Sequence, residues 1–516
     1  MSLGIAVRRW RLRNPDGCAA FDANVERTWR ELDERTSRLA NVLADRYGVS
    51  AGDRVALLAE NRVAVLEVLV GTHKAGAVYV GLNFRFDAAE LDGALENAQP
   101  RVLICSGEFA QRAAAVAAAR GIPVLDLDDA DSEGYEQVLV AAGDGAPPLM
   151  HRVRPDDVAC IVYTSGTTGR PKGVTFDHAA MLQHATIACL EYEIDSSTRY
   201  LIQIPHNSSV NITMAPCLVA GAAVGFADNR SFDPDRFASV VSDGRVTHTF
   251  LVPTQLMRIL DQLTDDDKRL DGLRTLGYGS SPIAPDRLRS LIERYGPIFI
   301  QLYGMAEIAS IGTLLRKDDH VRALSDRPQL LASCGRPSYG VDVLVVDDKG
   351  EEVPCGARGE VVFSGPHVMR GYHDDPARTA EAIYDGRMHS GDIAEMDADG
   401  YLYIVDRLKN LIIRGGQNIV PTEIENVLYR HPAVLEAAVV GAPDREWGER
   451  VVAVVALRRD ASAGADELAA TVESSELARF KRPEEIRVVD TLPKNAVGKI
   501  DKQAVRSWFW TDGRAV

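Results

Sequence analysis

Apolar segments of strand length alternate with helical patterns through the first hundred residues, and few architectures accommodate this alternation. Residues 54–60 and 77–82 are apolar runs typical of buried strands, and residues 63–74 between them predict a helix that ends at Gly76. The same order recurs further along, in three segments: 101–105, 110–119 and 123–127. Strands that alternate with helices predict largely parallel sheets covered on both faces. We therefore expect an α/β fold.

The pattern changes near residue 405. A predicted strand at 401–405 is followed by the charged stretch 406–410 and then by about a hundred residues of different texture. There we expect one strand at 435–440 and another at 451–457, with a loop between them. A helix at 467–480 and a further strand at 486–489 should follow. The sequence thus predicts a large domain over 1–406 and a small, hinged α+β domain over 407–516.

Charge and cysteine content exclude several classes of function. The 58 Lys and Arg residues against 74 Asp and Glu give a net charge of −16, which argues against nucleic-acid and anionic-membrane partners. The most apolar stretch, 214–227, contains Pro216 and is shorter than the ~18 residues that span a membrane, and the N-terminus lacks a signal-peptide pattern. Seven scattered cysteines without a CxxC pair indicate reduced thiols and no zinc site. We expect a cytoplasmic protein.

One segment carries most of the chemical information: residues 161–174, IVYTSGTTGRPKGV. Its glycines let the backbone approach a ligand, while hydroxyl and N–H groups donate to an anion and Lys172 adds charge. This composition predicts a phosphate-binding loop. The loop lacks the Lys-Ser/Thr pair of a Walker A motif.

TSGTTGRPKG resembles the signature loop of the adenylate-forming superfamily, which includes acyl-CoA synthetases, aryl-acid-activating enzymes, nonribosomal-peptide adenylation domains and luciferases. Six further stretches match in the expected order: QLYGMAE (301–307), Gly359-Glu360, SGD (390–392), DRLK (406–409), RGGQNIVPTEIE (414–425) and PKNAVGKI (493–500). The resemblance covers the chain from about residue 30 to residue 502. It implies the reaction of a carboxylate with ATP to an acyl-adenylate, followed by attack of a thiol.

The resemblance also implies roles for individual residues. The phosphates would be held by the loop residues Thr164, Ser165, Gly166, Thr167, Thr168 and Lys172. Glu307 would bind Mg²⁺, and Tyr303 would stack on adenine. The nucleotide would also contact Gly279, Ser280 and Gly304, and its ribose would contact Asp392 and Arg407.

In the C-terminal part, the resemblance makes Lys499 the lysine of the adenylation step and Lys409 the hinge. Rotation about this hinge would exchange the Lys499 loop for the RGGQN loop, in which Gly415 and Gly416 would line a tunnel for the pantetheine of CoA. Trp447, in GAPDREWGER, resembles CoA-ligase relatives, although it also suits ordinary packing.

Departures from the family pattern bear on the substrate. Ala306 replaces the usual Thr before Glu307, as in aryl-acid-activating relatives. The acyl-pocket segment lacks the Asp with which amino-acid-activating domains bind the substrate ammonium. His206, which we also expect to take part in catalysis, lies in a predicted acyl pocket with four polar neighbours: Asn207, Asn211, Ser280 and Ser281. Buried polar groups need partners. We expect a small polar or aromatic acid, unless these side chains satisfy one another or bound water.

The predicted function is an ATP-dependent carboxylate–CoA ligase that uses ATP, Mg²⁺ and CoA and releases AMP and pyrophosphate. One alternative is a stand-alone adenylating enzyme that passes its acid to a carrier protein or another nucleophile. A second, a non-catalytic nucleotide-binding regulator, is disfavoured because Lys172, Glu307, Asp392 and Lys499 are all retained. The predicted partners are the small acid, ATP and CoA, and a homodimer is left open.

Overall fold

A computed structural model describes residues 2–143, 145, 147, 152–164, 171–459, 461–494 and 500–510. The chain divides into two compact units. Unit 1 consists of Met1–Val343 and Val362–His389, and unit 2 of Leu344–Val361 and Ser390–Val516. Unit 2 therefore takes in two segments that precede residue 407. The domain division at 406/407 and the hinge at Lys409 remain predictions.

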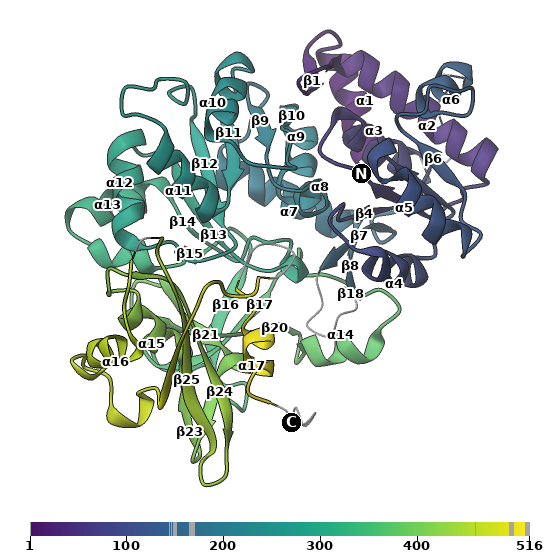
Figure 1. Ribbon diagram of the computed structural model, residues 1–516. Helices are drawn as coiled ribbons and strands as arrows, with labels where there is room; N and C mark the ends of the chain where they lie inside the picture. The colour runs from purple at the N-terminus through teal and green to yellow at the C-terminus, as the bar shows by residue number, and fades with distance from the viewer. Residues whose placement is uncertain are drawn as a thin grey trace. The chain divides into compact units, whose positions relative to one another are not determined.

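Unit 1 contains a seven-stranded sheet in the order β18-β8-β7-β4-β3-β5-β6 (Figure 1). Its strands are β3 (Arg54–Leu58), β4 (Val78–Leu82), β5 (Val102–Cys105), β6 (Val124–Asp126), β7 (Val158–Thr164), β8 (Lys172–Asp177) and β18 (Gly371–Tyr372). From β7 to β6 neighbouring strands are parallel, whereas β8 is antiparallel to both β7 and β18. The predicted strands at 54–60, 77–82, 101–105 and 123–127 are all present.

Helices α3 (Val63–Lys74), α4 (Ala88–Ala98) and α5 (Gly107–Ala118) connect these strands; α3 and α5 match the predicted helices, and α4 was not predicted. A core forms where Leu91 and Leu95 of α4 and Ala113 of α5 pack on β3 and β4 residues such as Leu58 and Val80. The strands β4 and β5 are apolar along their whole length, as is typical of parallel strands in a sheet covered on both faces.

A nine-stranded sheet in the same unit has the order β15-β14-β13-β12-β11-β9-β10-β1-β2. Its strands are β1 (Cys18–Phe21), β2 (Glu26–Thr28), β9 (Arg199–Ile202), β10 (Ala223–Phe226), β11 (His248–Leu251), β12 (Thr275–Gly279), β13 (Phe299–Tyr303), β14 (Thr313–Leu315) and β15 (Arg336–Pro337). The run from β13 to β1 is parallel. Helices α10 (Pro234–Asp243), α11 (Pro253–Gln262) and α12 (Pro285–Tyr295) pack in succession beside it (Figure 1). The predicted α/β class with mainly parallel sheets is confirmed.

A third sheet consists mostly of unit 2 residues: β20 (Arg387–Met396) pairs with β17 (Arg358–Ser364) and β21 (Leu402–Arg407), and β17 also pairs with β16 (Asp342–Val346). A second sheet has the order β23-β22-β25-β24, with β26 paired to β25. Its strands are β22 (Ile412–Arg414), β23 (Gln417–Ile419), β24 (Val434–Asp444), β25 (Gly448–Leu457) and β26 (Glu485–Val489). Alternate residues of β24 enter different cores: Ala437 and Val439 face α15 (Pro421–Leu428) and α16 (Ala465–Glu473), and Ala438 and Val440 face α17 (Lys502–Ser507).

Two predictions for this region are wrong in extent. The helix expected over 467–480 ends at Glu473, where Ser474 Oγ and Ser475 Oγ donate to the carbonyls of Thr471 and Val472. Serine hydroxyls that bond to nearby backbone compete with helix continuation. The expected loop 441–450 is mostly hairpin, because β24 extends to Asp444 and β25 begins at Gly448.

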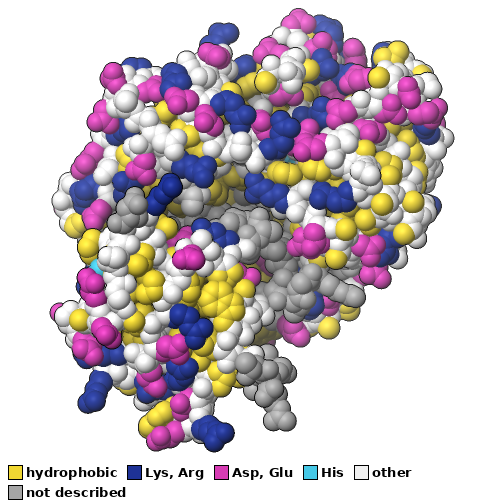
Figure 2. Space-filling model, viewed as in Figure 1, with side chains coloured by type: hydrophobic (Ala, Val, Ile, Leu, Met, Phe, Trp, Pro, Cys, Tyr) yellow, Lys and Arg dark blue, Asp and Glu magenta, His cyan; other side chains and the backbone are white. Residues whose placement is uncertain are grey.

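The surface of the described part mixes both signs of charge. On the face shown in Figure 2, Lys and Arg side chains are interspersed with Asp and Glu. Among the described residues, no helix is both long and apolar enough to cross a bilayer.

Candidate active site

Glu307, Tyr372 and Lys172 meet in unit 1 although they come from three separate segments. Tyr372, the last residue of β18, donates from Oη to Glu307 Oε1 over 2.7 Å, and its ring centroid lies 5.3 Å from Lys172 Nζ. Glu307 belongs to a short 3₁₀ turn, Ala306–Ile308, and is 8% exposed. No ion pair joins it to a Lys or Arg among the described residues. A buried carboxylate without a cationic partner is costly unless a cation arrives from elsewhere.

Lys172 is the first residue of β8 and pairs across the sheet with Thr164, the last residue of β7. These two residues bracket the predicted phosphate loop. The other loop residues predicted to hold phosphate, Ser165, Gly166, Thr167 and Thr168, lie outside the described residues, and so does Lys499. Their predicted roles remain predictions.

The ends of two parallel strands bring together the other predicted nucleotide-binding residues of unit 1. Gly279 ends β12 beside Leu302 of β13, which ends one residue later at Tyr303. A Cβ on Gly279 would lie 2.4 Å from the Leu302 carbonyl oxygen, and one on Gly304 would lie 2.7 Å from the Ser310 backbone. Both positions therefore exclude a side chain. Ligands of parallel α/β sheets bind beyond the carboxyl ends of the strands, where these residues lie.

Ser280 and Ser281 depart from the prediction that they are buried donors of the acyl pocket. Ser280 is exposed and Ser281 only partly buried. Ser280 has φ +70°, a left-handed conformation that non-glycine residues adopt rarely and at a cost. This conformation follows directly after β12, so the chain turns away from the sheet at once and leaves Ser280 in solvent.

The three remaining pocket residues are buried as predicted. His206 begins the short helix α8 (His206–Ser209), which continues into a π-helical turn, Val210–Met214. Asn207 and Asn211, four residues apart, are 4% and 5% exposed, and the Oδ1 atom of each lacks a hydrogen-bond partner among the described residues. The helix packs against β4, where a Cβ on Gly81 would lie 3.3 Å from Asn207 Cα. Single π-turns within helices are frequent at functional sites.

His206 is held by a residue that the sequence analysis did not single out. Tyr79 of β4 places its Oη 3.1 Å from His206 Nδ1. Burial lowers the pKa of His206 to about 4, so its imidazole is neutral at pH 7, and burial raises the pKa of Tyr79, which therefore stays a phenol. His206 is thus equipped to make neutral hydrogen bonds and carries no charge.

Unit 2 holds the predicted ribose-binding pair. Asp392 and Arg407 face each other across β20 and β21, with Arg407 Nε 3.1 Å from Asp392 Oδ1. Asp392 is 8% exposed and Arg407 is exposed. The Asp392 N–H is fixed by Ser390 Oγ at 3.0 Å.

The two glycines of the RGGQN loop both have left-handed backbone, with φ +56° at Gly415 and +78° at Gly416. A Cβ on Gly415 would lie 2.7 Å from Trp447 Cε3, and the Gly415 N–H donates to the Trp447 carbonyl over 2.7 Å. Trp447 is 46% exposed. The Trp447 ring therefore packs against the loop while it stays partly exposed to solvent, and it is not an ordinary core residue. Lys409, the predicted hinge, is exposed in a 3₁₀ turn.

The sequence analysis also missed Tyr372. Its strand, β18, is only two residues long, and the stretch RGYHDDP carries no pattern that distinguishes its tyrosine. Only its position after an Arg-Gly pair, where glycine allows an unusual backbone, could have drawn attention to it. Gly371 has φ +149°.

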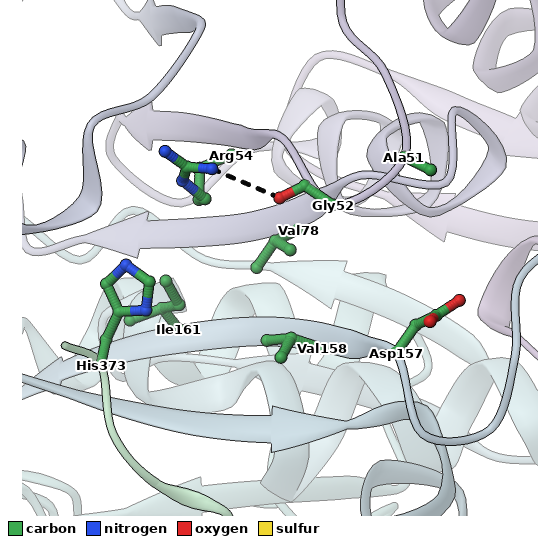
Figure 3. Close-up of a pocket in the computed structure, with 8 residues that line it drawn as sticks. All are labelled: Ala51, Gly52, Arg54, Val78, Asp157, Val158, Ile161 and His373. Carbon is green, nitrogen blue, oxygen red and sulfur yellow. Dashed lines mark hydrogen bonds between the residues drawn. The ribbon is translucent and has the colours of Figure 1, made fainter. Parts of the chain in front are cut away.

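A cavity of about 260 Å³ lies next to this strand (Figure 3). It is lined by Ala51, Gly52, Arg54, Val78, Asp157, Val158, Ile161 and His373. Arg54 and His373 lie toward one end and Asp157 toward the other (Figure 3). Arg54 donates to the backbone carbonyls of Ala98 and Gln99, so most of its donors are engaged. None of the predicted site residues lines this cavity.

Comparisons with known proteins agree with this geometry. The family model described as "AMP-binding enzyme" matches residues 7–373, and that described as "AMP-binding enzyme C-terminal domain" matches residues 423–499. A feruloyl-CoA synthase from an Amycolatopsis species is 40% identical over 507 residues, 98% of either chain. ATP-bound MatB from Rhodopseudomonas palustris superposes with TM-score 0.88 at 30% identity over 99% of each chain. The amide bond synthetase McbA from Marinactinospora thermotolerans gives TM-score 0.87 at 32% identity, over 98% of this chain and 99% of its own.

Proposed function

Because the chain belongs to the AMP-binding enzyme family and is an ATP-dependent acid–CoA ligase that forms AMP, we propose that the residues described above serve its two half-reactions. In the first, a carboxylate oxygen of the acid attacks the α-phosphorus of ATP and pyrophosphate leaves. In the second, the CoA thiol loses its proton, its sulfur attacks the acyl carbonyl, and AMP leaves.

Lys172 and Glu307 serve the first half-reaction. The Lys172 ammonium stands at the end of the phosphate loop, where it can contact the phosphates that carry the growing charge. Glu307 suits Mg²⁺ because it is a buried carboxylate with no cationic partner among the described residues. Bound Mg²⁺ would neutralise phosphate charge during pyrophosphate departure. The Tyr303 ring suits stacking on the flat adenine base. Gly279 and Gly304, where the surrounding backbone leaves no room for a side chain, let the base lie close to the ends of the strands.

Asp392 and Arg407 bind the ribose, and Lys499 contacts the reacting carboxylate and phosphate during adenylation. A carboxylate accepts from two neighbouring hydroxyls at once, and Arg407 orients Asp392 through its hydrogen bond to Oδ1. Gly415 and Gly416 line the path of the CoA thiol in the second half-reaction, after movement at Lys409. The assignment of Lys499 rests on its motif alone, and the others rest on the family motifs together with the local geometry of each described residue.

The acid is polar or aromatic and carries a hydroxyl or amino group. The observation that supports this choice is the pair of buried amide oxygens, Asn207 Oδ1 and Asn211 Oδ1, that lack a hydrogen-bond partner among the described residues. A hydrogen-bond donor on the acid would satisfy them, whereas a plain aliphatic chain would leave them unpaired at about 1–3 kcal/mol each. A relative at 40% identity bears the name feruloyl-CoA synthase, which agrees with an aromatic acid.

ATP–pyrophosphate exchange across a panel of acids tests this proposal. The panel contains benzoate, salicylate, cinnamate, ferulate, hydroxy and plain aliphatic acids, and octanoate. We expect the highest kcat/KM for a hydroxylated acid and no exchange in the Glu307→Gln or Lys172→Ala variants. Highest kcat/KM for octanoate or a longer acid would refute the assigned acid class.

The same enzyme preparation also tests which nucleophile accepts the acyl group. The similarity to an amide bond synthetase favours an amine as the alternative nucleophile to CoA. AMP release is measured with the preferred acid and ATP alone, with CoA, and with a panel of amines. We expect CoA to accelerate AMP release most. Acceleration by an amine or a carrier protein but not by CoA would instead establish a stand-alone adenylating enzyme. Mg²⁺ dependence is read from the same assay, and gel filtration tests whether the protein is a homodimer.

A further inference from the structure

Tyr372 stands between two groups of opposite charge. Its hydroxyl donates to Glu307 and its ring faces the Lys172 ammonium, and no ion pair joins Lys172 to Glu307 among the described residues. A tyrosine phenol is neutral at pH 7 and carries one O–H, which Tyr372 donates to Glu307. Lys172 and Glu307 therefore each interact with the neutral Tyr372 side chain.

The backbone around Tyr372 is fixed from several sides. The Tyr372 N–H donates to Thr379 Oγ1 over 2.9 Å, and Thr175 Oγ1 of β8 donates to the Gly371 carbonyl over 2.7 Å. A Cβ on Gly371 would lie 2.8 Å from Thr379 Cγ2, so only glycine fits there. The next residue, His373, lines the cavity of Figure 3, as expected if strand alternation turns neighbouring side chains to opposite faces. The Tyr372 side chain thus has a fixed position.

From this arrangement we infer that Tyr372 is a positioning residue that keeps Lys172 and Glu307 from pairing with each other. A direct ion pair would neutralise both groups and would have to be broken before nucleotide and Mg²⁺ bind. A phenol hydrogen bond and a ring–ammonium contact hold the same two groups less strongly. The inference rests on the proposed roles of Lys172 in phosphate binding and of Glu307 in Mg²⁺ binding.

The two contacts of Tyr372 can be separated by substitution. Tyr372→Phe keeps the ring beside Lys172 and removes the donor to Glu307. Tyr372→Leu removes both contacts and leaves space for Lys172 to reach Glu307. The control is Tyr135→Phe, since Tyr135 likewise donates to a buried glutamate, Glu67 Oε2, over 2.9 Å.

The measurement is ATP affinity by isothermal titration, without turnover, in EDTA and in Mg²⁺. Affinity in EDTA reports on Lys172, and the gain on adding Mg²⁺ reports on Glu307. We expect Tyr372→Phe to bind ATP normally in EDTA but to lose about 10–100-fold of the Mg²⁺ gain, as metal sites do when a hydrogen bond to a ligand is removed. Tyr372→Leu should in addition bind ATP about tenfold more weakly in EDTA, the size of a lost contact to a charged group.

Tyr135→Phe should match wild type in both titrations even where its melting temperature falls. A Tyr372→Phe variant with the full Mg²⁺ gain, or a Tyr372→Leu variant with normal ATP affinity in EDTA, would overturn the inference alone. Wild-type affinity that does not respond to Mg²⁺ would overturn the Glu307 assignment and the inference together. Equal losses in Tyr135→Phe would show a general effect of instability and would also overturn it.

Discussion

Replacing Asn207 by leucine, which has nearly the same shape, should weaken the selection of hydroxylated acids. Asn207 is 4% exposed, and its Oδ1 has no partner among the described residues. Pairing this oxygen with a substrate hydroxyl gains about 1–3 kcal/mol, the cost of leaving a buried acceptor unpaired. Because 1.4 kcal/mol is a factor of ten, the ratio of kcat/KM for salicylate over benzoate, or for ferulate over cinnamate, should fall roughly 5- to 150-fold.

The assay is ATP–pyrophosphate exchange with each pair of acids. The plain acid should lose little, because leucine leaves nothing unpaired when it binds. The same substitution should leave the melting temperature unchanged or raise it, since a buried unpaired oxygen is removed from the free protein. An unchanged ratio together with a lower melting temperature would refute the reasoning, because it would place Asn207 in a structural network away from the acid.

Three further predictions concern other parts of the molecule. Lys499→Ala should lower adenylation ~10²–10³-fold and leave thioester formation from supplied acyl-adenylate nearly intact; exchange within a few-fold of wild type would contradict this role. Gly415→Ala, at φ +56° and with its Cβ 2.7 Å from Trp447, should slow thioester formation and spare pyrophosphate exchange, as rapid-quench assays of each step would reveal. Melting temperature should fall between pH 7 and pH 5, because burial lowers the pKa of His73, His320 and His367 to about 4. Below about pH 6.5 the unfolded chain binds protons that the folded one does not, so folding loses stability; a constant or rising melting temperature would contradict this.

Much of the fold follows from local sequence. The apolar runs and helical patterns gave strands such as β3 and β4 and the helix α3 with nearly correct ends, because hydrophobic periodicity and capping residues act over a few neighbours. Errors arose where side chains compete with the backbone locally: the serines after Glu473 end α16 early. The resemblance of the loop motif and of QLYGMAE likewise identified Lys172 and Glu307 as candidates without any three-dimensional information.

The sequence by itself therefore determined the types of secondary structure, the parallel α/β class and the chemical identity of most candidate site residues. The tertiary structure alone decided which of them meet. Tyr372 lies 65 residues from Glu307 along the chain, and their contact depends on β18 pairing with β8. The burial of Asn207, the exposure of Ser280 and the contact of Tyr79 with His206 were decided in the same way. These features depend on how distant strands and helices pack, and no local pattern encodes the distance between residues far apart in the chain.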